Sequence, residues 1–349
     1  MAAKTRRRVR RPQRRHKTHR ALRRAALLAA LALLAVLAGF VVQNWGGTGW
    51  IPTWAQLYKA VGLTDPASAD AMPLEGTAVT VLDVGQGDAV LIAQNNEFCL
   101  IDAGDYAHAD ALLAQLRTAG VPRIDLLVMT HPHADHIGAM LTVVRNFSVG
   151  QLLMPDLAVP EQAGAFDPGT LNRLLDACAE RGIPTVTAAA GDEFSVGQGN
   201  LRVLQAGFVP PAKSSDDGIN DASLCLLFTA GSFRFLDTGD AEKDAETALA
   251  ASGQDLRCTL MKAGHHGSAT SNTALLLAAA QPRAIAVSCG RNNDYGHPHQ
   301  AALDRMAAAG AAVYRTDLDG AITFVPAADG LRVATAQTAR DGGALLPAA

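Results

Sequence analysis

The chain has 349 residues, more than one compact α/β domain usually needs and rather few for two full ones. Hydrophobic residues make up 49% and charged residues 18%, which supplies a sizeable core and excludes a disordered or fibrous protein. The net charge of −3 conceals an uneven distribution, because residues 1–24 contain 12 Lys or Arg and no Asp or Glu. The other residues carry 18 basic and 33 acidic side chains, so we expect a basic tail (residues 1–24) before an acidic body.

An apolar run of 18 residues without a charge, residues 25–42, follows the tail. As a helix it would be roughly 27 Å long, close to the hydrocarbon thickness of a bilayer. Basic residues precede the run and none follows it until Lys59, so the positive-inside bias predicts a cytoplasmic N-terminus and an extracellular body. Trp45, Trp50 and Trp54 lie just past the run and suit the outer headgroup layer. We predict a retained single-pass anchor in the cell membrane.

Two alternatives apply to this N-terminal region. Small residues at 36–38 would also suit cleavage of a signal peptide, although the tryptophans have no obvious role on a released protein. The arginine run could bind nucleic acid, but attraction to anionic lipid explains a basic cytoplasmic flank without such a partner.

Residues 43–75 are rich in Gly, Pro, Ala, Asp and Thr, which is typical of a linker. In the body, short apolar runs predict strands at 78–84, 89–94, 97–104, 124–130, 201–207, 223–231, 233–240, 258–264, 284–290 and 321–327. Helical periodicity predicts helices at 108–118, 138–145, 169–180, 241–251, 271–281 and 300–309. Strands come first and then alternate with helices, which predicts mixed α/β layers on two sheets in one domain, residues 76–337. We expect residues 338–349 to be a frayed, flexible tail.

Seven of the eight histidines in the body fall into three clusters: His131, His133 and His136 in THPHADH, His265 and His266 in KAGHHGS, and His297 and His299 in YGHPH. The first two clusters each follow an apolar run, and strand ends are where loops converge to hold a metal ion. Asp240 also ends a predicted strand, where a bridging carboxylate is expected. Ordinary surface polarity would need all these groups to gather at strand ends without a function, so we interpret them as a metal site.

The spacing H-x-H-x-D-H divides the first cluster into two sets. It puts His131 and His133 on one side of an extended turn, while Asp135 and His136 point elsewhere, toward a second ion. Two neighbouring divalent ions can bind the oxygens of a phosphodiester and lower the pKa of a shared water toward about 7. Asp135 would orient that water or accept its proton.

The motifs LDVGQGDAVLI, IDAG, THPHADH, FLDTGD, KAGHHGS and NDYGHPH together resemble the metallo-β-lactamase fold. Within that fold the sequence is most similar to the hydrolase domain of ComEC-type DNA-uptake (competence) proteins, over residues 78–325. The resemblance implies an αββα sandwich with a metal site along one edge of the paired sheets, and a hydrolase activity. The sequence shows one predicted span in place of the multi-helix channel of competence proteins, so we do not expect DNA transport by this chain alone.

The resemblance also implies six metal ligands: His131, His133, Asp135, His136, Asp240 and His265. The first two would bind one ion and the next two a second ion, with Asp240 between them. Of the adjacent pair it favours His265 over His266, although the choice stays open. It places His297 near the substrate phosphate, so we assign catalytic roles to His297 and Asp135.

The sequence departs from the commonest pattern of the fold at one place. Many members carry another histidine on a strand before the bridging carboxylate, whereas this chain has GINDASL there, with Asn220 and Asp221 as weaker candidate ligands. Fewer imidazoles and more oxygen ligands shift the preference from zinc toward manganese. We therefore expect two divalent ions, either Zn or Mn.

The residues predict a metal site, and the resemblance implies that its function is metal-dependent phosphodiester hydrolysis. The resemblance favours DNA or another nucleic acid as the substrate, although an acidic body would repel a polyanion. A hydrolase of a small ester, lactone or lactam on the same metal site is the alternative, since the fold alone does not decide. A non-catalytic surface binding protein is a third interpretation, which six converging ligands disfavour. The sequence predicts no particular protein partner.

Other polar residues near the motifs receive lesser roles. Four basic residues could form a positive lip, although ordinary solvated surface explains each of them: Lys262, Arg283, Arg291 and Arg305. Four residues of LDVGQGD and IDAG are interpreted as turn residues or as residues behind the ligands: Asp83, Gln86, Asp88 and Asp102.

Overall fold

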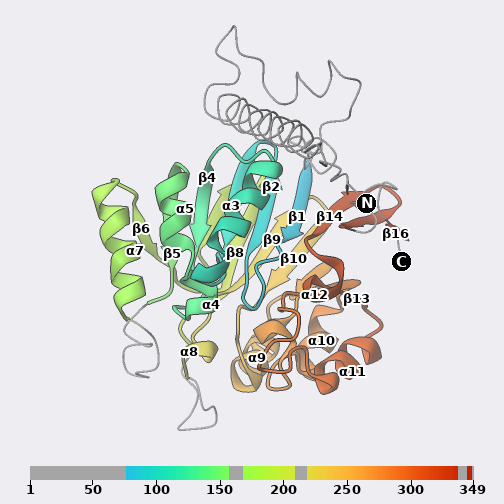
Figure 1. The fold of residues 1–349 in the computed structure, drawn as a ribbon. Coiled ribbons are helices and arrows are strands. Elements are labelled where there is room, and N and C mark those ends of the chain that lie inside the picture. The colour runs from blue at the N-terminus through green and yellow to red at the C-terminus, as the bar shows by residue number, and fades with distance from the viewer. Residues whose placement is uncertain (1–75, 157–167, 209–217, 337–343, 348–349) are drawn as a thin grey trace, which may run out of the picture. The chain divides into compact units, whose positions relative to one another are not determined.

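The computed structural model describes residues 76–156, 168–208, 218–336 and 344–347, all within one unit of the chain, Ala69–Ala349. In these residues two β-sheets pack face to face and helices cover the outer face of each (Figure 1). The expected αββα sandwich is confirmed. The predicted anchor (residues 25–42) lies outside the described residues. Within the described part of the chain, no helix is both long and apolar enough to cross a membrane.

The first sheet has the strand order β16-β15-β14-β1-β2-β3-β4-β5-β6. Its strands are β1 (Thr77–Val81), β2 (Val90–Gln94), β3 (Glu97–Ile101), β4 (Ile124–Val128), β5 (Val149–Met154), β6 (Thr185–Thr187), β14 (Ile322–Ala327), β15 (Gly330–Thr335) and β16 (Ala344–Pro347). β1, β2 and β3 form the antiparallel meander that the short apolar runs predict. From β3 to β6 neighbouring strands are parallel, so the segments that follow β3, β4 and β5 leave the same edge of the sheet.

The second sheet has the order β13-β12-β11-β10-β9-β8-β7. Its strands are β7 (Glu193–Val196), β8 (Gly199–Gln205), β9 (Cys225–Ala230), β10 (Phe233–Asp237), β11 (Leu260–Lys262), β12 (Ala284–Val287) and β13 (Ala312–Arg315). The four strands from β10 to β13 are parallel, so their following loops also share one edge.

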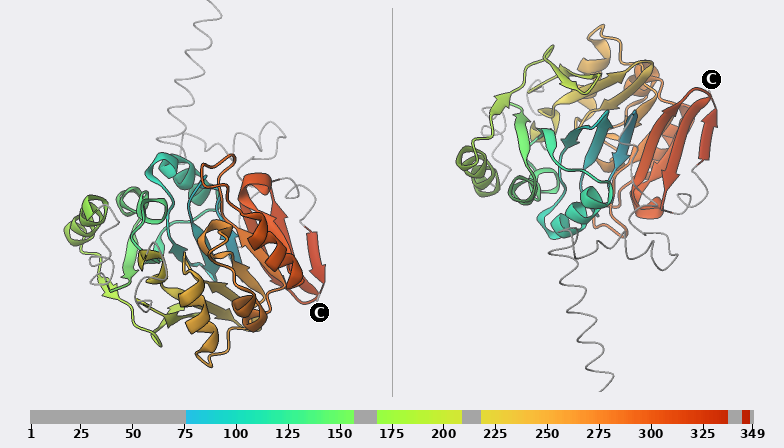
Figure 2. Two further views of the ribbon diagram at one scale, coloured as in Figure 1. Left: turned by 90° about the horizontal axis from the view of Figure 1, so that it is seen from below. Right: turned by 90° about the horizontal axis from the view of Figure 1, so that it is seen from above.

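Helices lie on both outer faces, with the teal and green ones on one side of the strands and the orange ones on the other (Figure 2). α3 (Ala109–Thr118), α5 (Met140–Asn146) and α7 (Pro168–Glu180) cover the first sheet. α9 (Lys243–Ala251), α10 (Ala274–Ala280) and α11 (Gln300–Ala308) cover the second. Short helical segments occupy the loops: η2 (Tyr106–His108), α4 (Ala134–Ile137), α8 (Gly218–Asp221), η3 (Gly264–Gly267) and α12 (Thr316–Asp319).

The core has one layer between the sheets and one layer under each set of helices. In β2, Val90 and Ile92 face the second sheet, whereas Leu91 and Ala93 face the helices. A strand that is buried on both faces needs apolar residues at successive positions, which is why its sequence reads as a continuous apolar run. The same burial explains why the central strands were predictable from composition.

The strands at the sheet edges and those next to them were not predictable in this way. β5, β6, β7, β13 and β15 were not expected, because their residues are partly exposed and mix polar with apolar side chains. Residues 344–347, which we expected to be part of a flexible tail, instead form β16 and pair with β15. Leu346 packs against the layer between the sheets, and this contact together with the strand pairing orders the segment.

Candidate metal centre

The predicted ligands lie on loops at one edge of the sandwich. THPHADH follows β4, the segment that ends at Asp240 follows β10, and the adjacent histidines in η3 follow β11. α4, α8 and α9 mark this edge at the lower ends of the strands in Figure 1. Because the parallel strands of both sheets end here, side chains from distant parts of the sequence converge.

The Asp240 carboxylate lies at the middle of the convergence. Its Oδ2 atom is 3.2 Å from His136 Nε2, 3.5 Å from His266 Nε2, and 3.8 Å from both His131 Nε2 and His265 Nε2. Burial would raise the pKa of Asp240, but the surrounding imidazoles outweigh it and hold this pKa well below its usual value. An ionised carboxylate that faces four imidazole nitrogens is a candidate ligand for a cation.

His131 and His133 form one side of the cluster. His131 Nε2 lies 3.0 Å from His133 Nδ1, so the two nitrogens are close enough to bind the same ion. On the other side of its ring, His131 Nδ1 lies 3.1 Å from Thr130 Oγ1 and 3.3 Å from Ser223 Oγ. Burial and the neighbouring imidazoles hold the pKa of His131 well below its usual value, which favours the neutral ring that a metal requires.

Ser223 belongs to GINDASL, the segment where many members of the fold carry a further histidine. Its hydroxyl accepts a hydrogen bond from the Asp240 backbone N–H at 3.1 Å, besides approaching His131. The weaker candidates Asn220 and Asp221 are directed elsewhere: the Asn220 amide donates to Glu242 Oε1 at 3.4 Å, and Asp221 Oδ1 accepts from the Glu242 backbone N–H at 2.9 Å. These contacts position Glu242 rather than add a ligand.

His136 is held from behind by Asp102. Asp102 Oδ2 lies 2.7 Å from His136 Nδ1 and also accepts from the Thr130 hydroxyl at 2.6 Å. Burial would lower the pKa of His136, but the carboxylates of Asp240 and Asp102 outweigh it and raise this pKa well above the usual value. A carboxylate on the far ring nitrogen fixes the tautomer and orientation of a metal-binding histidine, and Asp102 does so with Nε2 turned toward Asp240.

His265 and His266 occupy a backbone turn with φ values of 49° and 52°. Each non-glycine residue in the left-handed region costs on the order of 1–2 kcal/mol, so consecutive examples mark a constrained segment. His266 is buried, with Nδ1 3.1 Å from the Ser288 carbonyl and Nε2 3.2 Å from Asp135 Oδ2. His265 is partly exposed, with Nδ1 3.4 Å from Glu242 Oε1. Both rings therefore reach the cluster, and His266 lies deeper than the sequence indicated.

A buried pair, Asp88 and Lys262, borders the cluster. The sequence indicates a turn residue or a residue behind the ligands for Asp88 and solvated surface for Lys262, but both side chains are almost fully buried and form an ion pair. Burial would raise the pKa of Asp88, but Lys262 and His266 lower it below its usual range. Asp88, His136, Asp240 and His266 each offer one ligand atom, and these four atoms lie within 4.8 Å of one another.

Asp88 reaches the cluster because of the glycine before it. Gly87 has a φ of 144°, and a Cβ atom there would lie 2.4 Å from the Asp135 carbonyl oxygen. Without a side chain at this position, the Asp88 N–H donates to the same carbonyl at 3.0 Å. The signal in the sequence was therefore the Gly-Asp pair that ends GQGD.

The donor atoms of this cluster fit a divalent cation. Asp88 Oδ1, His136 Nε2, Asp240 Oδ1 and His266 Nε2 are all buried, and although charged neighbours lie near them, none makes a hydrogen bond of good geometry among the described residues. An unsatisfied buried polar group costs about 1–3 kcal/mol, and a charged one more. Each of these four residues brings one nitrogen or carboxylate oxygen to within 4.8 Å of the others, and such atoms are the donors that Zn²⁺ or Mn²⁺ takes.

His297 stands beside the cluster rather than in it. Its ring centroid is 5.4 Å from that of His265 and 6.1 Å from that of His266. Burial and these neighbouring imidazoles lower the pKa of His297 to about 4, so the ring is neutral at physiological pH. Its Nδ1 atom is buried and has no hydrogen-bond partner among the described residues.

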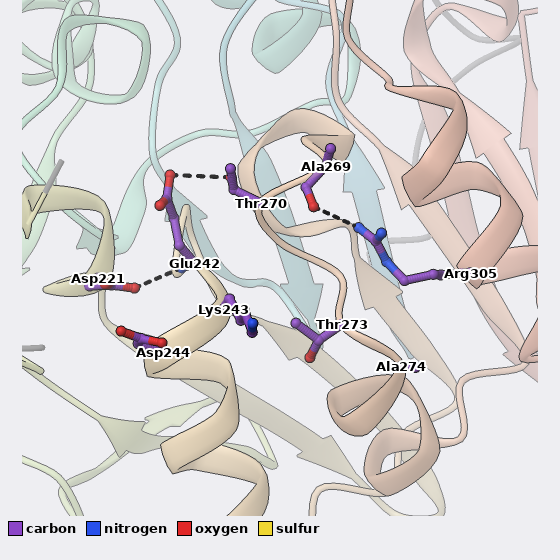
Figure 3. Close-up of a pocket in the computed structure, with 9 residues that line it drawn as sticks. All are labelled: Asp221, Glu242, Lys243, Asp244, Ala269, Thr270, Thr273, Ala274 and Arg305. Atoms are coloured by element: carbon purple, nitrogen blue, oxygen red, sulfur yellow. Dashed lines mark hydrogen bonds between the residues drawn. The ribbon is translucent and has the colours of Figure 1, made fainter. Parts of the chain in front are cut away.

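A pocket of about 480 Å³ opens next to the cluster, between the first turns of α9 and α10 (Figure 3). Glu242 joins the two features, because Oε1 accepts from the Thr270 hydroxyl at 3.2 Å and also faces His265. Lys243 and Arg305 line the pocket together with acidic residues, so its charge is mixed.

The chain is similar to known proteins over most of the body. The metallo-β-lactamase superfamily matches residues 82–291. ComE operon protein 3 of Bacillus subtilis (strain 168) is 28% identical over 264 residues, which cover 70% of this chain and 32% of that protein. Competence protein ComA of Neisseria gonorrhoeae is 32% identical over 257 residues, which cover 73% and 33%. The chain thus spans about a third of the length of these relatives.

A solved structure shows the same fold. CmlA, a diiron β-hydroxylase from Streptomyces venezuelae, aligns with a TM-score of 0.50 over 79% of this chain and 60% of its own, at 16% identity. This likeness concerns the fold alone, whereas the superfamily match and the relatives confirm the resemblance to competence-protein hydrolase domains. The chain belongs to the metallo-β-lactamase superfamily and carries the candidate metal centre of a metal-dependent hydrolase.

Proposed function

We propose that this chain is a metal-dependent phosphodiesterase that cleaves DNA or another nucleic acid. The observation that carries the proposal is the set of buried, unpaired nitrogen and oxygen atoms around Asp240, at the loop edge of a metallo-β-lactamase sandwich. The substrate class is supported by relatives whose names refer to competence and recombination, two processes that handle DNA. Because the chain spans about a third of these relatives, transport of DNA is not part of the proposal.

Two ligand sets share the central carboxylate in this proposal. The first set is His131, His133 and Asp240, with His265 beside it. The second set is Asp135, His136, Asp240 and His266, with Asp88 beside it. When bound, two neighbouring divalent cations supply Lewis-acid charge for phosphodiester oxygens and make a water easier to deprotonate. The carboxylates in the second set favour manganese over zinc there.

Asp135 is the group that we assign to the proton of the attacking water. Burial would raise the pKa of Asp135, but His266 and His136 outweigh it and lower this pKa to about 2, so the carboxylate is ionised at neutral pH. Its side chain is 31% exposed, compared with 3% for Asp240, so it meets water that enters from solvent. An ionised carboxylate can accept a proton, and its partial exposure lets water approach it, which supports this assignment.

His297 is the group that we assign to the substrate phosphate. Because its ring is neutral, it can donate one hydrogen bond to a phosphate oxygen without adding a positive charge to the imidazole cluster. Its position beside His265 and His266 puts that hydrogen bond next to the candidate ligands.

The test compares substitutions at two positions in the full chain, purified in mild detergent. Asp135→Asn should retain part of the bound metal but lose about 10²–10⁴-fold in hydrolysis rate, because an amide cannot accept a proton. His133→Ala should lose both metal and activity, because it removes a direct ligand. Metal content is measured after loading with Zn²⁺ or Mn²⁺, and hydrolysis is measured on single- and double-stranded DNA. Wild-type protein that leaves both DNA substrates intact under both metals would contradict the proposal.

The same assay decides the alternatives. Cleavage of a lactam, lactone or ester reporter without cleavage of DNA would establish a small-molecule hydrolase on the same metal site. Metal binding without hydrolysis of any of these substrates would favour a binding protein instead.

We also propose that residues 25–42 anchor the chain in the cell membrane, with the basic tail (1–24) inside, the linker (43–75) outside and the hydrolase domain (76–337) extracellular. The proposal rests on the length of the apolar run and on the arginines that precede it. Protease added to intact cells should digest the hydrolase domain. A domain that survives until lysis, or that is released free into the medium, would refute the anchor.

A further inference from the structure

A row of aromatic rings leads from the candidate metal centre to the surface. Tyr295 stacks on His297 with a centroid distance of 5.6 Å and an interplanar angle of 19°. His297 in turn lies 5.4 Å from His265, so Tyr295 and His265 are no more than about 11 Å apart. His297 is buried, whereas Tyr295 is 66% exposed. One face of the tyrosine ring therefore rests on the histidine, and the ring presents its remaining surface to solvent next to the site.

The loop that carries Tyr295 is fixed by one side chain. The Asn293 side-chain carbonyl accepts from the backbone N–H groups of Tyr295 at 3.2 Å and His297 at 3.0 Å. Its amide donates to the carbonyls of Gly290 at 2.9 Å and His297 at 2.6 Å. The Gly290 N–H also donates to Gln86 Oε1 at 3.1 Å, which ties the loop to the segment before Asp88. An exposed aromatic ring on a fixed loop is pre-organised for contact with a ligand.

The charges around this surface favour contact with a base rather than with phosphates. Apart from the N-terminal tail, the chain has an excess of 15 acidic side chains, and Asp294 precedes Tyr295. Arg291 donates to the Asp317 carbonyl, and Arg305 donates to the carbonyls of Ala269, Ser271 and Asn272. These arginines use their donors to hold loops through backbone carbonyls, so fewer donors remain for phosphates. Contact with a base would add to binding of a strand without depending on basic side chains.

We propose that Tyr295 is a stacking site for a nucleobase of a single-stranded substrate, one or two nucleotides from the phosphodiester at the metal centre. The inference rests on the proposed phosphodiesterase function and specifies its substrate. In a duplex both faces of a base are covered by its neighbours, so only a single strand or a strand end can offer a free face to the tyrosine. Stacking on an aromatic ring tolerates any base, which predicts weak sequence preference.

The experiment measures binding without metal and hydrolysis with metal as separate readouts on the full chain in detergent. A fluorescently labelled single-stranded 12-mer and the same 12-mer with abasic sites are titrated in EDTA and followed by anisotropy. Because removal of a stacking ring costs about 1–3 kcal/mol per base, Tyr295→Ala should weaken binding of the 12-mer by roughly 5- to 150-fold. Tyr295→Phe, which keeps the ring, should bind like the wild type.

Two comparisons separate stacking from a general loss of structure. The abasic 12-mer should bind the wild type as weakly as it binds Tyr295→Ala, because neither combination can stack. Tyr106→Ala is the matched control, since Tyr106 is 72% exposed but lies on a different segment, η2. It should bind the 12-mer like the wild type.

Three outcomes would overturn the inference. The first is that Tyr295→Ala binds the 12-mer as tightly as the wild type does. The second is that Tyr295→Ala loses as much affinity for the abasic 12-mer as for the base-containing 12-mer. The third is that Tyr106→Ala loses as much affinity for the 12-mer as Tyr295→Ala does. Hydrolysis with Mn²⁺ is scored independently. A wild type that binds through Tyr295 but cleaves no strand would refute the phosphodiesterase function and leave the stacking site supported. Cleavage that depends neither on Tyr295 nor on the bases would support the phosphodiesterase function and refute the stacking site.

Discussion

The layer between the two sheets and the loop edge of the same sheets are both buried, but the first consists of apolar side chains and the second includes charged ones. Between the sheets the buried side chains are apolar, with Phe228 and Phe235 among the largest. At the loop edge the buried side chains include Asp88, Asp240 and Lys262. An unpaired buried charge is destabilising, and even a paired one adds little to stability. The comparison teaches that the sheets supply the stability, while the edge holds donor atoms whose partners the fold does not provide.

The largest expected effect at the edge comes from Asp240→Asn. An amide cannot bridge two cations, so we expect less than one equivalent of bound metal and a loss of hydrolysis of about 10⁴-fold or more, equivalent to about 5.5 kcal/mol. Metal analysis after loading and initial rates on DNA check this, with circular dichroism to confirm folding. A folded variant that keeps two equivalents of metal would show that Asp240 is not a bridging ligand.

The largest expected effect in the interior comes from Phe228→Ala. This ring is fully buried between the sheets. A Cβ atom added at Gly199 would lie only 2.5 Å from the ring, which shows how closely the backbone packs against it. We expect the free energy of unfolding to fall by about 3–5 kcal/mol, measured by urea titration, with metal content unchanged in the folded protein. Leu318→Ala, a matched substitution at a residue that is 56% exposed, should change it by less than about 0.5 kcal/mol. Similar losses from both substitutions would show that burial between the sheets is not what makes Phe228 important for stability.

A buried acid near the edge predicts a pH dependence of stability. Burial raises the pKa of Glu246 to about 7 from the usual 4.5, although the carboxylate accepts the backbone N–H groups of Asn272 at 2.6 Å and Thr273 at 2.7 Å. The folded state therefore favours the protonated form, whose contribution to stability is full below pH 4.5 and is lost as the pH rises to about 7.

The expected loss over this window is on the order of 3 kcal/mol in the free energy of unfolding, measured by urea titration of metal-free protein. Glu246→Gln cannot ionise and should lack this part of the pH dependence. If wild type and Glu246→Gln gave parallel profiles between pH 4.5 and 7, the buried carboxyl would not be the cause.

The smallest expected effect concerns the carboxylate behind His136. Asp102→Asn removes the charge that orients this ring, so we expect metal affinity to fall by about 10–100-fold, or roughly 1.4–2.7 kcal/mol. Asp125→Asn is the matched control. Asp102 accepts the backbone N–H of Thr130 at 2.9 Å and Asp125 accepts that of Phe98 at 2.9 Å, but Asp125 lies at the start of β4. Competition with a chelator measures both variants. Equal affinities for Asp102→Asn and the wild type would argue against a role for the orienting carboxylate.

The sequence by itself predicted mixed α/β layers on two sheets and the residues of a candidate metal site, and its resemblance to a known family supplied the sandwich. Central strands such as β2 are buried on both faces and therefore carry continuous apolar runs, which are visible without a structure. The histidine clusters are visible for a related reason, because imidazole and carboxylate groups rarely gather at strand ends by chance.

Tertiary structure decided what depends on contacts between distant segments. The edge strand β6 has little apolar signal of its own and forms because β5 offers a free edge. Asp88 and Lys262, 174 positions apart, become buried partners only when the two sheets bring their loops together. Whether His265 or His266 lies deeper in the cluster is likewise set by backbone angles in η3, since two identical side chains at adjacent positions carry no difference that the sequence could show.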